Sequence, residues 1–479
     1  MIPLYPKSWQ RAAVVVTIIA ILAVGLCAWP YTVDDAFIVA RYARRLALGQ
    51  GYTFNPGPPT DGVTGPLWLL PGWLASLVGL DAVRAAKLAG LVCTALAGAL
   101  LVQRLTRRRY GTRYACAAAL LLACQPTLGA WGVAGLETGA ATLAVTIAWL
   151  ALSARPRVQR WTLAAALAVL PWLRPELTLV AALLALGAGW KLGWPRVGPI
   201  WALLGASLGT LALFRASLFG TLLPLAYYAK QGSLAHGADY VARGTLIVPG
   251  VFGLPLLIRG ARHGRRDDLF LGWLLLAHLA AIWLAGGDWM PGFRLFAPLL
   301  PLALGLCASG AMQPAQKCSY ARIALLSLTA LVLAIDLATR IPDWQAAGLS
   351  RERNGAALAE RLRSSARRVA LVDIGFLAYQ SGVDVIDLGG ITEPAIARLP
   401  GAHLDKRVRE DWLAEQAPDA LLLHSSRPPL LAADGGLREL SGYPVEQRVA
   451  SWAWTRAQFR VAFTQAYAPH YHYVLMLRR

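Results

Sequence analysis

Two adjacent acidic residues, Asp34 and Asp35, directly follow the first long apolar run of the chain. Adjacent carboxylates at the edge of a bilayer are costly unless they are solvated or used in function. One interpretation is structural, because aspartate favours the N-cap position and a helix is predicted from Ala36. The other is catalytic, with one acid as general base and the other orienting a group or binding a cation. The two interpretations are compatible.

Further polar residues fall in short segments between later apolar runs. They are Glu137, Arg174, Glu176, Tyr228, Lys230, Asp288 and Arg294. If the apolar runs are membrane helices, these residues lie at the same membrane level as the two aspartates. Cations there suit a phosphate, which arginine can bind bidentately, and aromatic rings suit a sugar or an acyl chain. For each residue alone, structural pairing is the simpler explanation, so their shared level is what favours function.

The composition is that of a polytopic membrane protein. Hydrophobic residues make up 57% of the chain and charged residues only 15%, against about 25% charged in soluble proteins. The uncharged run 12–29 is close to the length that crosses a bilayer, and it is interpreted as a retained helix rather than a cleaved signal peptide. The net charge of +20 lies in short loops, so the positive-inside rule explains it better than nucleic-acid binding does.

About 11 transmembrane helices are predicted within residues 1–340. They are placed near 12–29, 83–103, 114–130, 134–153, 161–175, 177–192, 198–215, 245–258, 269–285, 295–312 and 323–340. With this count all the basic loops fall on one face, which predicts a cytoplasmic N-terminus. The first outer loop, about 30–82, then carries an interfacial helix at 36–48 and a second apolar segment at 67–80.

Residues 341–479 are predicted to form a small extracytoplasmic α/β domain. Strand-like runs at 369–374, 383–388, 420–424 and 473–477 alternate with helical patterns at 353–365 and 405–417. The chain shows no Gly-rich nucleotide loop before a helix and no Ser-His-Asp or metal-ligand motif. A soluble nucleotide is therefore not the expected donor, and an activated group carried on a lipid is the alternative. A transporter or flippase and a non-catalytic assembly protein are competing hypotheses, although internal symmetry typical of transporters is not evident.

The ordered motifs resemble those of bacterial GT-C glycosyltransferases, a family that includes the mycobacterial terminal arabinofuranosyltransferase and related enzymes of Gram-negative bacteria. The resemblance in the first outer loop rests on Asp34–Tyr42, Gly49–Gly57 and Gly62–Trp68. Later motifs are Gly135–Thr138, Arg174–Glu176, Phe219–Thr221, Tyr227–Lys230, Gly287–Met290, Asp373–Gly375 and Val385–Gly390. Together they cover nearly the whole chain in order.

This resemblance implies a GT-C fold and a polyprenyl-phosphate-linked sugar donor. It also implies inversion at the anomeric carbon, with Asp34 as general base and Asp35 as the alternative. Charge and position suggest donor contacts at Arg41, Arg174, Glu176, Tyr228, Lys230, His236, Asp288 and Arg294. Further candidate site residues are Glu137, Thr64 and Trp68. A lone loop histidine such as His236 is more often simply solvated.

No metal or other cofactor is expected, because arginines can neutralise a single phosphate, although some GT-C enzymes use a divalent cation. Arabinofuranose is the first expectation for the sugar, with mannose or another sugar as the alternative. The expected acceptor is a hydroxyl of a glycan or of a pilin-like protein at the outer face of the bacterial inner membrane. The chain is expected to be a monomer among the membrane lipids.

Overall fold

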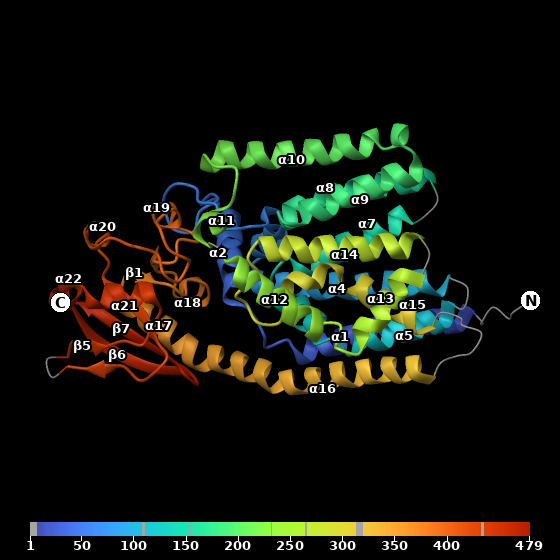
Figure 1. The fold of residues 1–479 in the computed structure, drawn as a ribbon. Helices are drawn as coiled ribbons and strands as arrows, with labels where there is room; N and C mark the ends of the chain where they lie inside the picture. Colours follow the sequence, from blue (N-terminus) through green and yellow to red (C-terminus); the bar gives the residue numbers. More distant parts are fainter. Residues whose placement is uncertain are drawn as a thin grey trace, which may run out of the picture.

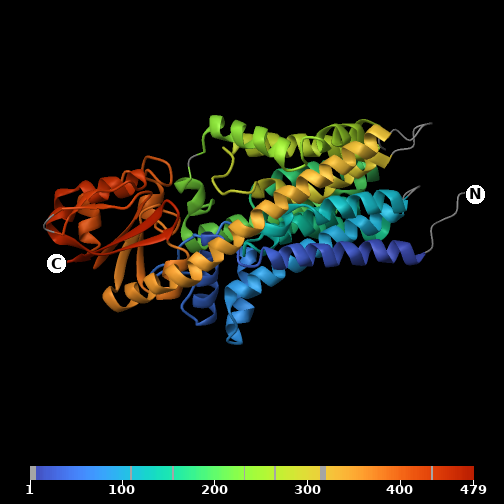
Figure 2. The same ribbon diagram turned by 90° about the horizontal axis from the view of Figure 1, so that it is seen from below.

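The computed structural model describes residues 7–107, 111–153, 156–230, 232–263, 266–312, 320–432 and 435–479. Figure 1 shows a bundle of helices with a small α/β domain at one end, and the first described residues of the chain at the opposite end of the bundle. The helix α16 (Tyr320–Ser350) runs along the bundle towards this domain, as the view in Figure 2 also shows. The predicted domain boundary at residue 340 falls inside this continuous helix.

Helices of different lengths make up the bundle. Their bounds are α1 (Lys7–Cys27), α4 (Ala82–Thr106), α5 (Gly111–Ala123), α6 (Pro126–Val133), α7 (Thr138–Leu152), α8 (Pro156–Leu173), α9 (Leu177–Leu192), α10 (Gly198–Phe219), α12 (Leu234–Ile247), α13 (Gly253–His263), α14 (Arg266–Leu284) and α15 (Leu300–Met312). Among the described residues, six helices are long and apolar enough to cross a membrane, or seven if the bent pair α5–α6 is one span. Four other apolar helices are shorter. The predicted number of about eleven spans is therefore not confirmed.

Two predicted helices have different boundaries in the structure, and proline accounts for both. The predicted helix at 114–130 is two helices, α5 and α6, which meet at 61°. Pro126 has no N–H to continue the first helix, and the Gln125 side chain caps the second by accepting from Thr127 N. The predicted helix at 245–258 would contain Pro249; instead α12, which was not predicted, ends at Ile247 and α13 begins at Gly253.

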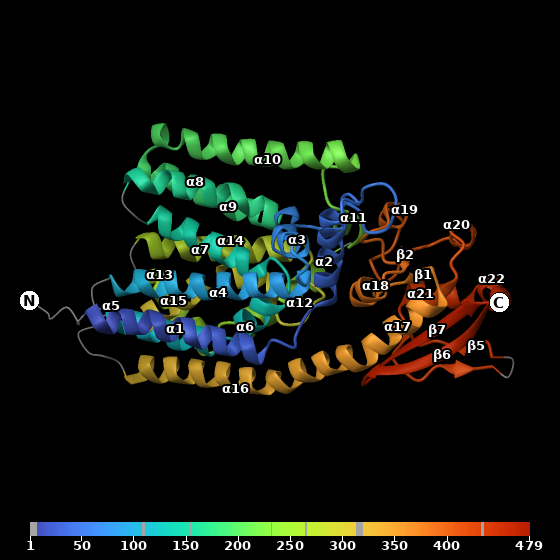
Figure 3. The same cartoon turned by 180° about the vertical axis from the view of Figure 1, so that it is seen from behind.

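Short helices close the end of the bundle that faces the α/β domain. The amphipathic α2 (Asp34–Ala47) lies there, close to the predicted interfacial helix, and is followed by η1 (Pro66–Trp68) and α3 (Leu69–Leu77). Figure 3 shows α2 and α3 between the bundle and the domain. Further short elements at this end are α11 (Leu225–Ala229) and η3 (Arg294–Leu299). Apolar side chains of α2, including Ile38 and Tyr42, share one core with Leu377 and Val385 of the domain.

The α/β domain contains a five-stranded sheet in the order β2-β1-β3-β7-β6. Its strands are β1 (Arg368–Leu371), β2 (Asp384–Asp387), β3 (Ala420–Ser425), β6 (Phe459–Ala468) and β7 (Tyr471–Arg478). Strand β1 pairs in parallel with both β2 and β3, and β7 pairs antiparallel with both β3 and β6. Four strands were predicted, whereas β6 was not, because this edge strand is half-exposed and carries polar residues.

Helices and a short hairpin complete the domain. From α16 the chain continues through the turn η4 (Arg351–Gly355) into α17 (Ala356–Ser365). The other elements are α18 (Phe376–Ser381), α19 (Pro394–Ala397), α20 (Glu410–Glu415), the hairpin β4 (Leu430–Leu431) and β5 (Leu437–Glu439), α21 (Pro444–Ser451) and α22 (Ala453–Gln458). The domain meets the short helices at the end of the bundle, where α18 contacts α2 and α19 contacts α11.

Candidate functional site

A cavity of about 380 Å³ lies where the short helices meet the bundle. Its walls come from α2, residues 62–65, the segments between α6 and α7 and between α8 and α9, the α11 region, α14 and the segment that follows α14. Ile391 adds a contact from the α/β domain. Four carboxylic acid side chains and three lysine or arginine side chains line the cavity: Asp35, Glu137, Glu176, Asp288, Arg174, Lys230 and Arg294. Residues far apart in the sequence thus meet at the level that the sequence predicted.

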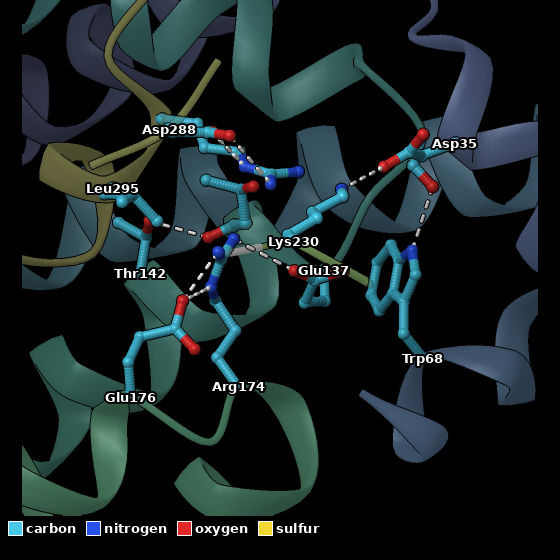
Figure 4. A network of polar contacts seen from close by, with 12 residues as sticks. Asp35, Trp68, Glu137, Thr142, Arg174, Glu176, Lys230, Asp288 and Leu295 are labelled. Carbon is cyan, nitrogen blue, oxygen red and sulfur yellow. Dashed lines mark hydrogen bonds and ion pairs between the residues drawn. The ribbon is translucent and has the colours of Figure 1, made fainter. Parts of the chain in front are cut away.

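Arg174 lies at the centre of one charged cluster, shown in Figure 4. It follows α8 directly, and its guanidinium forms ion pairs with Glu137 at 3.0 Å and with Glu176 at 2.6 Å. Pro175 ends the helix here because proline disfavours helical backbone in the preceding residue. Arg174 is only 5% exposed, so its two carboxylate partners offset the cost of burying its charge.

The segment between α14 and η3 supplies a second ion pair. Arg294 Nε lies 2.7 Å from Asp288 Oδ2, and the guanidinium carbon lies 5.7 Å from the centre of the Trp131 ring. The same ring donates from Nε1 to Gly292 O at 2.9 Å. Trp131 therefore contacts this segment at both Gly292 and Arg294, and these contacts fix the position of the Arg294 guanidinium at the cavity wall.

Asp35 and Lys230 form the third pair, at 3.5 Å. Burial alone would raise the pKa of the Asp35 carboxyl, but the positive charges of Lys230 and Arg294 outweigh it and lower the pKa below its usual value. Asp35 is thus an ionised carboxylate that faces the cavity at neutral pH. The distance between Asp35 and Lys230 is the longest among the ion pairs of this site. The Lys230 ammonium can therefore contact an anionic ligand with the smallest loss of ion-pair energy.

Asp34 does not line the cavity. Its two carboxylate oxygens accept from the backbone N–H groups of Gly375 at 2.7 Å and Phe376 at 2.8 Å, at the start of α18. Burial and the nearby charge of Asp373 raise the pKa of Asp34 to about 6. Aspartate does act as a helix cap here, but of α18 in the distant α/β domain rather than of its own helix α2.

Arg41 and Trp68, two other predicted site residues, hold the first loop together. The Arg41 guanidinium donates to the carbonyls of Phe54, Ala378 and Val383 at 2.5 to 2.8 Å. Trp68 donates from Nε1 to Gly135 O at 2.9 Å. Neither side chain lines the cavity. The structure therefore places Arg41 at the contact between α2 and the α/β domain, outside the lining of the charged cavity.

Tyr228 and His236 also lie outside the cavity lining. The Tyr228 ring packs under the Arg398 guanidinium at 5.4 Å, whereas its neighbour Tyr227 faces the cavity. His236 is solvent-exposed and its Nε2 lies 3.3 Å from Asp288 O. Thr64 does line the cavity, and its carbonyl accepts from Arg215.

Two buried cations that support the site were missed in the sequence. Arg215 of α10 pairs with Asp61 at 3.0 Å, and both side chains are at most 2% exposed. Lys87 of α4 donates to Tyr31 O at 3.0 Å and to Thr32 Oγ1 at 2.6 Å, immediately before α2. Arg215 is the one basic residue of its apolar run 198–215, and Lys87 lies three residues after Arg84 at the start of the run 83–103. Basic residues inside apolar runs are unusual in a membrane helix, and that pattern could have singled both out.

Within the described residues, no group of three or more His, Cys, Asp or Glu side chains lies close enough together to hold a metal ion. The metal dependence of the chain stays a prediction.

The fold is of the GT-C type. The chain matches the crystal structure of ArnT from Cupriavidus metallidurans bound to undecaprenyl phosphate with a TM-score of 0.60 at 13% identity, over 98% of this chain and 97% of that chain. The apo structure of the same protein matches with a TM-score of 0.58 at 13% identity, over 96% and 97%. With its long apolar helices, the chain is therefore a multi-pass membrane protein.

Sequence comparison identifies a particular relative, the terminal β-(1→2)-arabinofuranosyltransferase of Corynebacterium glutamicum. The two are 27% identical over 357 residues, which are 62% of this chain and 52% of the relative. The chain thus spans about half the length of this curated relative. Residues 342–474 match a family model described as a domain of unknown function, DUF8728. The predicted resemblance to GT-C glycosyltransferases is confirmed by these matches.

Proposed function

We propose that this protein is an inverting membrane glycosyltransferase that moves a sugar from a polyprenyl phosphate to an acceptor hydroxyl. The observation that carries the proposal is the cavity in which a carboxylate, Asp35, lies beside three cations, Lys230, Arg174 and Arg294. A general base and a phosphate-binding group are the two functions that such a displacement requires. The motif resemblance favours Asp34 as the general base, but we propose Asp35, because it is the aspartate that lines the cavity.

The reaction would be a single displacement. The acceptor oxygen attacks the anomeric carbon while its proton passes to Asp35, and the bond between that carbon and the phosphate oxygen breaks on the opposite face. The electron pair leaves with the polyprenyl phosphate, whose growing negative charge the cations stabilise. The products are an inverted glycoside and a polyprenyl phosphate, and no other reactant is needed.

Lys230 is proposed as the main contact of the donor phosphate, because Arg174 and Arg294 are held more closely by their carboxylate partners. The lining contains four carboxylates and three of these cations, so a phosphate must draw at least one cation away from its partner. The undecaprenyl phosphate in the ArnT structure supports a donor of this class. Ala281 and Ile282 of α14, with Ala285 directly after this helix, give the cavity an apolar wall suited to the first units of a lipid chain.

Arabinofuranose is proposed first as the sugar, because the curated relative is a terminal arabinofuranosyltransferase; mannose or another sugar is the alternative. The proposed acceptor is a glycan or protein hydroxyl at the outer face of the inner membrane, with the α/β domain on that side. We propose that the protein acts as a monomer without a metal cofactor.

The test uses the full chain, purified in lipid nanodiscs, with polyprenyl-phosphate arabinofuranose or mannose and with envelope extracts from a deletion strain as the acceptor source. Mass spectrometry should show acceptors gaining one pentose or one hexose, and Asp35→Asn should abolish this gain. Glycans of the deletion strain should lack the same sugar. Accumulation of the lipid-linked sugar inside sealed vesicles, without any glycosidic product, would instead identify a transporter.

A further inference from the structure

A second cavity, of about 270 Å³, lies on the far side of Trp131 from the charged site. It is bounded by Tyr31 before α2, by α6, by Pro291 and Gly292, and by Arg340, Asp343, Trp344 and Ala347 of α16. Trp131 and the segment 288–294 form its boundary with the first cavity, because Trp131 lines the second cavity while Arg294, which lies over the Trp131 ring, lines the first. The two cavities are therefore neighbours across one tryptophan.

Aromatic rings form much of the wall of this second cavity. The centre of the Tyr31 ring lies 6.1 Å from that of Trp131 in an edge-to-face arrangement and 6.4 Å from that of Trp344. Aromatic side chains combine a large apolar face with a polar tip that can hydrogen-bond. A sugar ring, with C–H groups on its faces and hydroxyls at its edge, fits such a wall.

The polar groups of the cavity favour a neutral ligand. Within the described part of the chain, the carboxylate of Asp343 has no ion-pair or hydrogen-bond partner. Arg340 uses its Nε to pair with Asp336 at 2.9 Å. Of the residues that line the cavity, Asp343 and Arg340 carry opposite charges, so the lining offers no excess positive charge to a lipid phosphate but can exchange hydrogen bonds with hydroxyl groups. Its volume is below the roughly 300 Å³ at which sites for drug-sized ligands begin, so it suits a single ring.

We infer that the second cavity binds a neutral sugar ring of the acceptor glycan while another ring of the same glycan presents its hydroxyl to Asp35. The inference rests on the proposed function, and it identifies the acceptor as a glycan of at least two sugars. Trp131 separates the donor phosphate from the acceptor chain, so the two substrates approach the reacting centre from different sides. Asp343 and Arg340 bind ring hydroxyls, and Trp344 and Tyr31 contact the ring faces.

The test blocks the cavity without removing any contact of the charged site. Ala347 lines the cavity and Ala346 does not, and both are exposed on the same helix, so Ala347→Trp and Ala346→Trp are a matched pair. Neutral octyl glycosides of one and two arabinofuranose or mannose units, with sn-glycerol 1-phosphate as the anionic probe, are titrated by saturation-transfer NMR in nanodiscs. We expect Ala347→Trp and Asp343→Asn to weaken glycoside binding at least tenfold and Ala346→Trp to leave it unchanged.

Glycoside binding and sugar transfer are measured separately, so the inference about the second cavity and the proposed transferase function can each fail without the other. Glycoside binding that is lost in Ala347→Trp supports the inference even if no sugar is ever transferred, in which case only the proposed function fails. Where transfer to the two-unit glycoside occurs, the KM of the glycoside should rise in Ala347→Trp and the KM of the donor should not. Equal glycoside binding by Ala347→Trp and Ala346→Trp, or stronger binding of glycerol phosphate than of the glycosides, would overturn the inference.

Discussion

Asp34 and Asp35 are neighbours in the sequence but belong to two different regions of the molecule. The Asp35 carboxylate faces the cavity beside Lys230, whereas Asp34 accepts two backbone hydrogen bonds from the α/β domain. Successive residues of a helix do not share a face, so a helix that lies between bundle and domain must direct one aspartate to each. Two adjacent acids can thus have different environments, with one carboxylate facing a cavity and the other fixing the orientation of the helix that carries both.

The largest effect should separate the two aspartates. Asp35→Asn should lower the rate of sugar transfer by about 10²- to 10⁴-fold, the usual contribution of a general base, with donor binding and thermal stability retained. Asp34→Asn should leave much more of the rate and lower the thermal midpoint, because an amide nitrogen cannot accept from Gly375 or Phe376 N–H. Transfer rates and unfolding midpoints of both variants provide the measurement. Loss of transfer in Asp34→Asn at unchanged stability would make Asp34 the base after all.

Substitution of Lys230 tests whether this side chain binds the donor phosphate in the cavity. Lys230→Met should raise the KM of the donor by about ten- to a hundredfold, the loss expected for a hydrogen bond to a charged group. Lys191→Met is the matched control, since Lys191 pairs with Asp267 at 2.9 Å in an exposed position outside the cavity lining. Steady-state kinetics with varied donor measure both. An unchanged donor KM in Lys230→Met would remove Lys230 from the phosphate site.

Substitution of Gly375 tests the contact between α2 and the α/β domain. A Cβ at this position would overlap the Asp34 carbonyl oxygen and its carboxylate. Gly375→Ala should therefore lower the free energy of unfolding by about 1–3 kcal/mol, the usual cost of overpacking, and increase hydrogen exchange in α18. Gly209→Ala is the control, because a Cβ there meets no atom within 4 Å. Equal thermal midpoints and exchange rates in the two variants would argue against a tight contact between α2 and the domain.

The smallest expected effect is a shift in pH dependence. The pKa of Asp35 lies below its usual 3.8, so the base is ionised above that pH and its protonation should reduce kcat/KM only in more acidic solution. In Lys230→Met, burial is no longer offset by the ammonium, so the pKa of Asp35 rises and the acid limb should move to higher pH. The pH profile of kcat/KM for both proteins, with residual transfer in the variant, measures this. An acid limb at the same pH in both would show that Lys230 does not control Asp35.

Composition and periodicity were enough to predict most of the apolar helices, the amphipathic α2 and the set of polar segments that meet at one end of the bundle. These features depend on local composition and periodicity. Because Glu137, Arg174, Glu176, Lys230, Asp288 and Arg294 each lie between apolar runs, their common level followed from the runs alone.

The choice of side chains that face the cavity depends on packing between segments that are distant in the sequence. Asp35 rather than Asp34, and Tyr227 rather than Tyr228, line it, while Arg41 and Trp68 hold the first loop. The rotation of α2 about its axis is fixed by contacts with residues more than 300 positions away, such as those from Gly375 and Phe376 to Asp34. A local pattern does not contain such contacts. The sequence therefore predicted that both aspartates lie near the site, whereas the direction of each side chain depends on the packing of α2 against the domain.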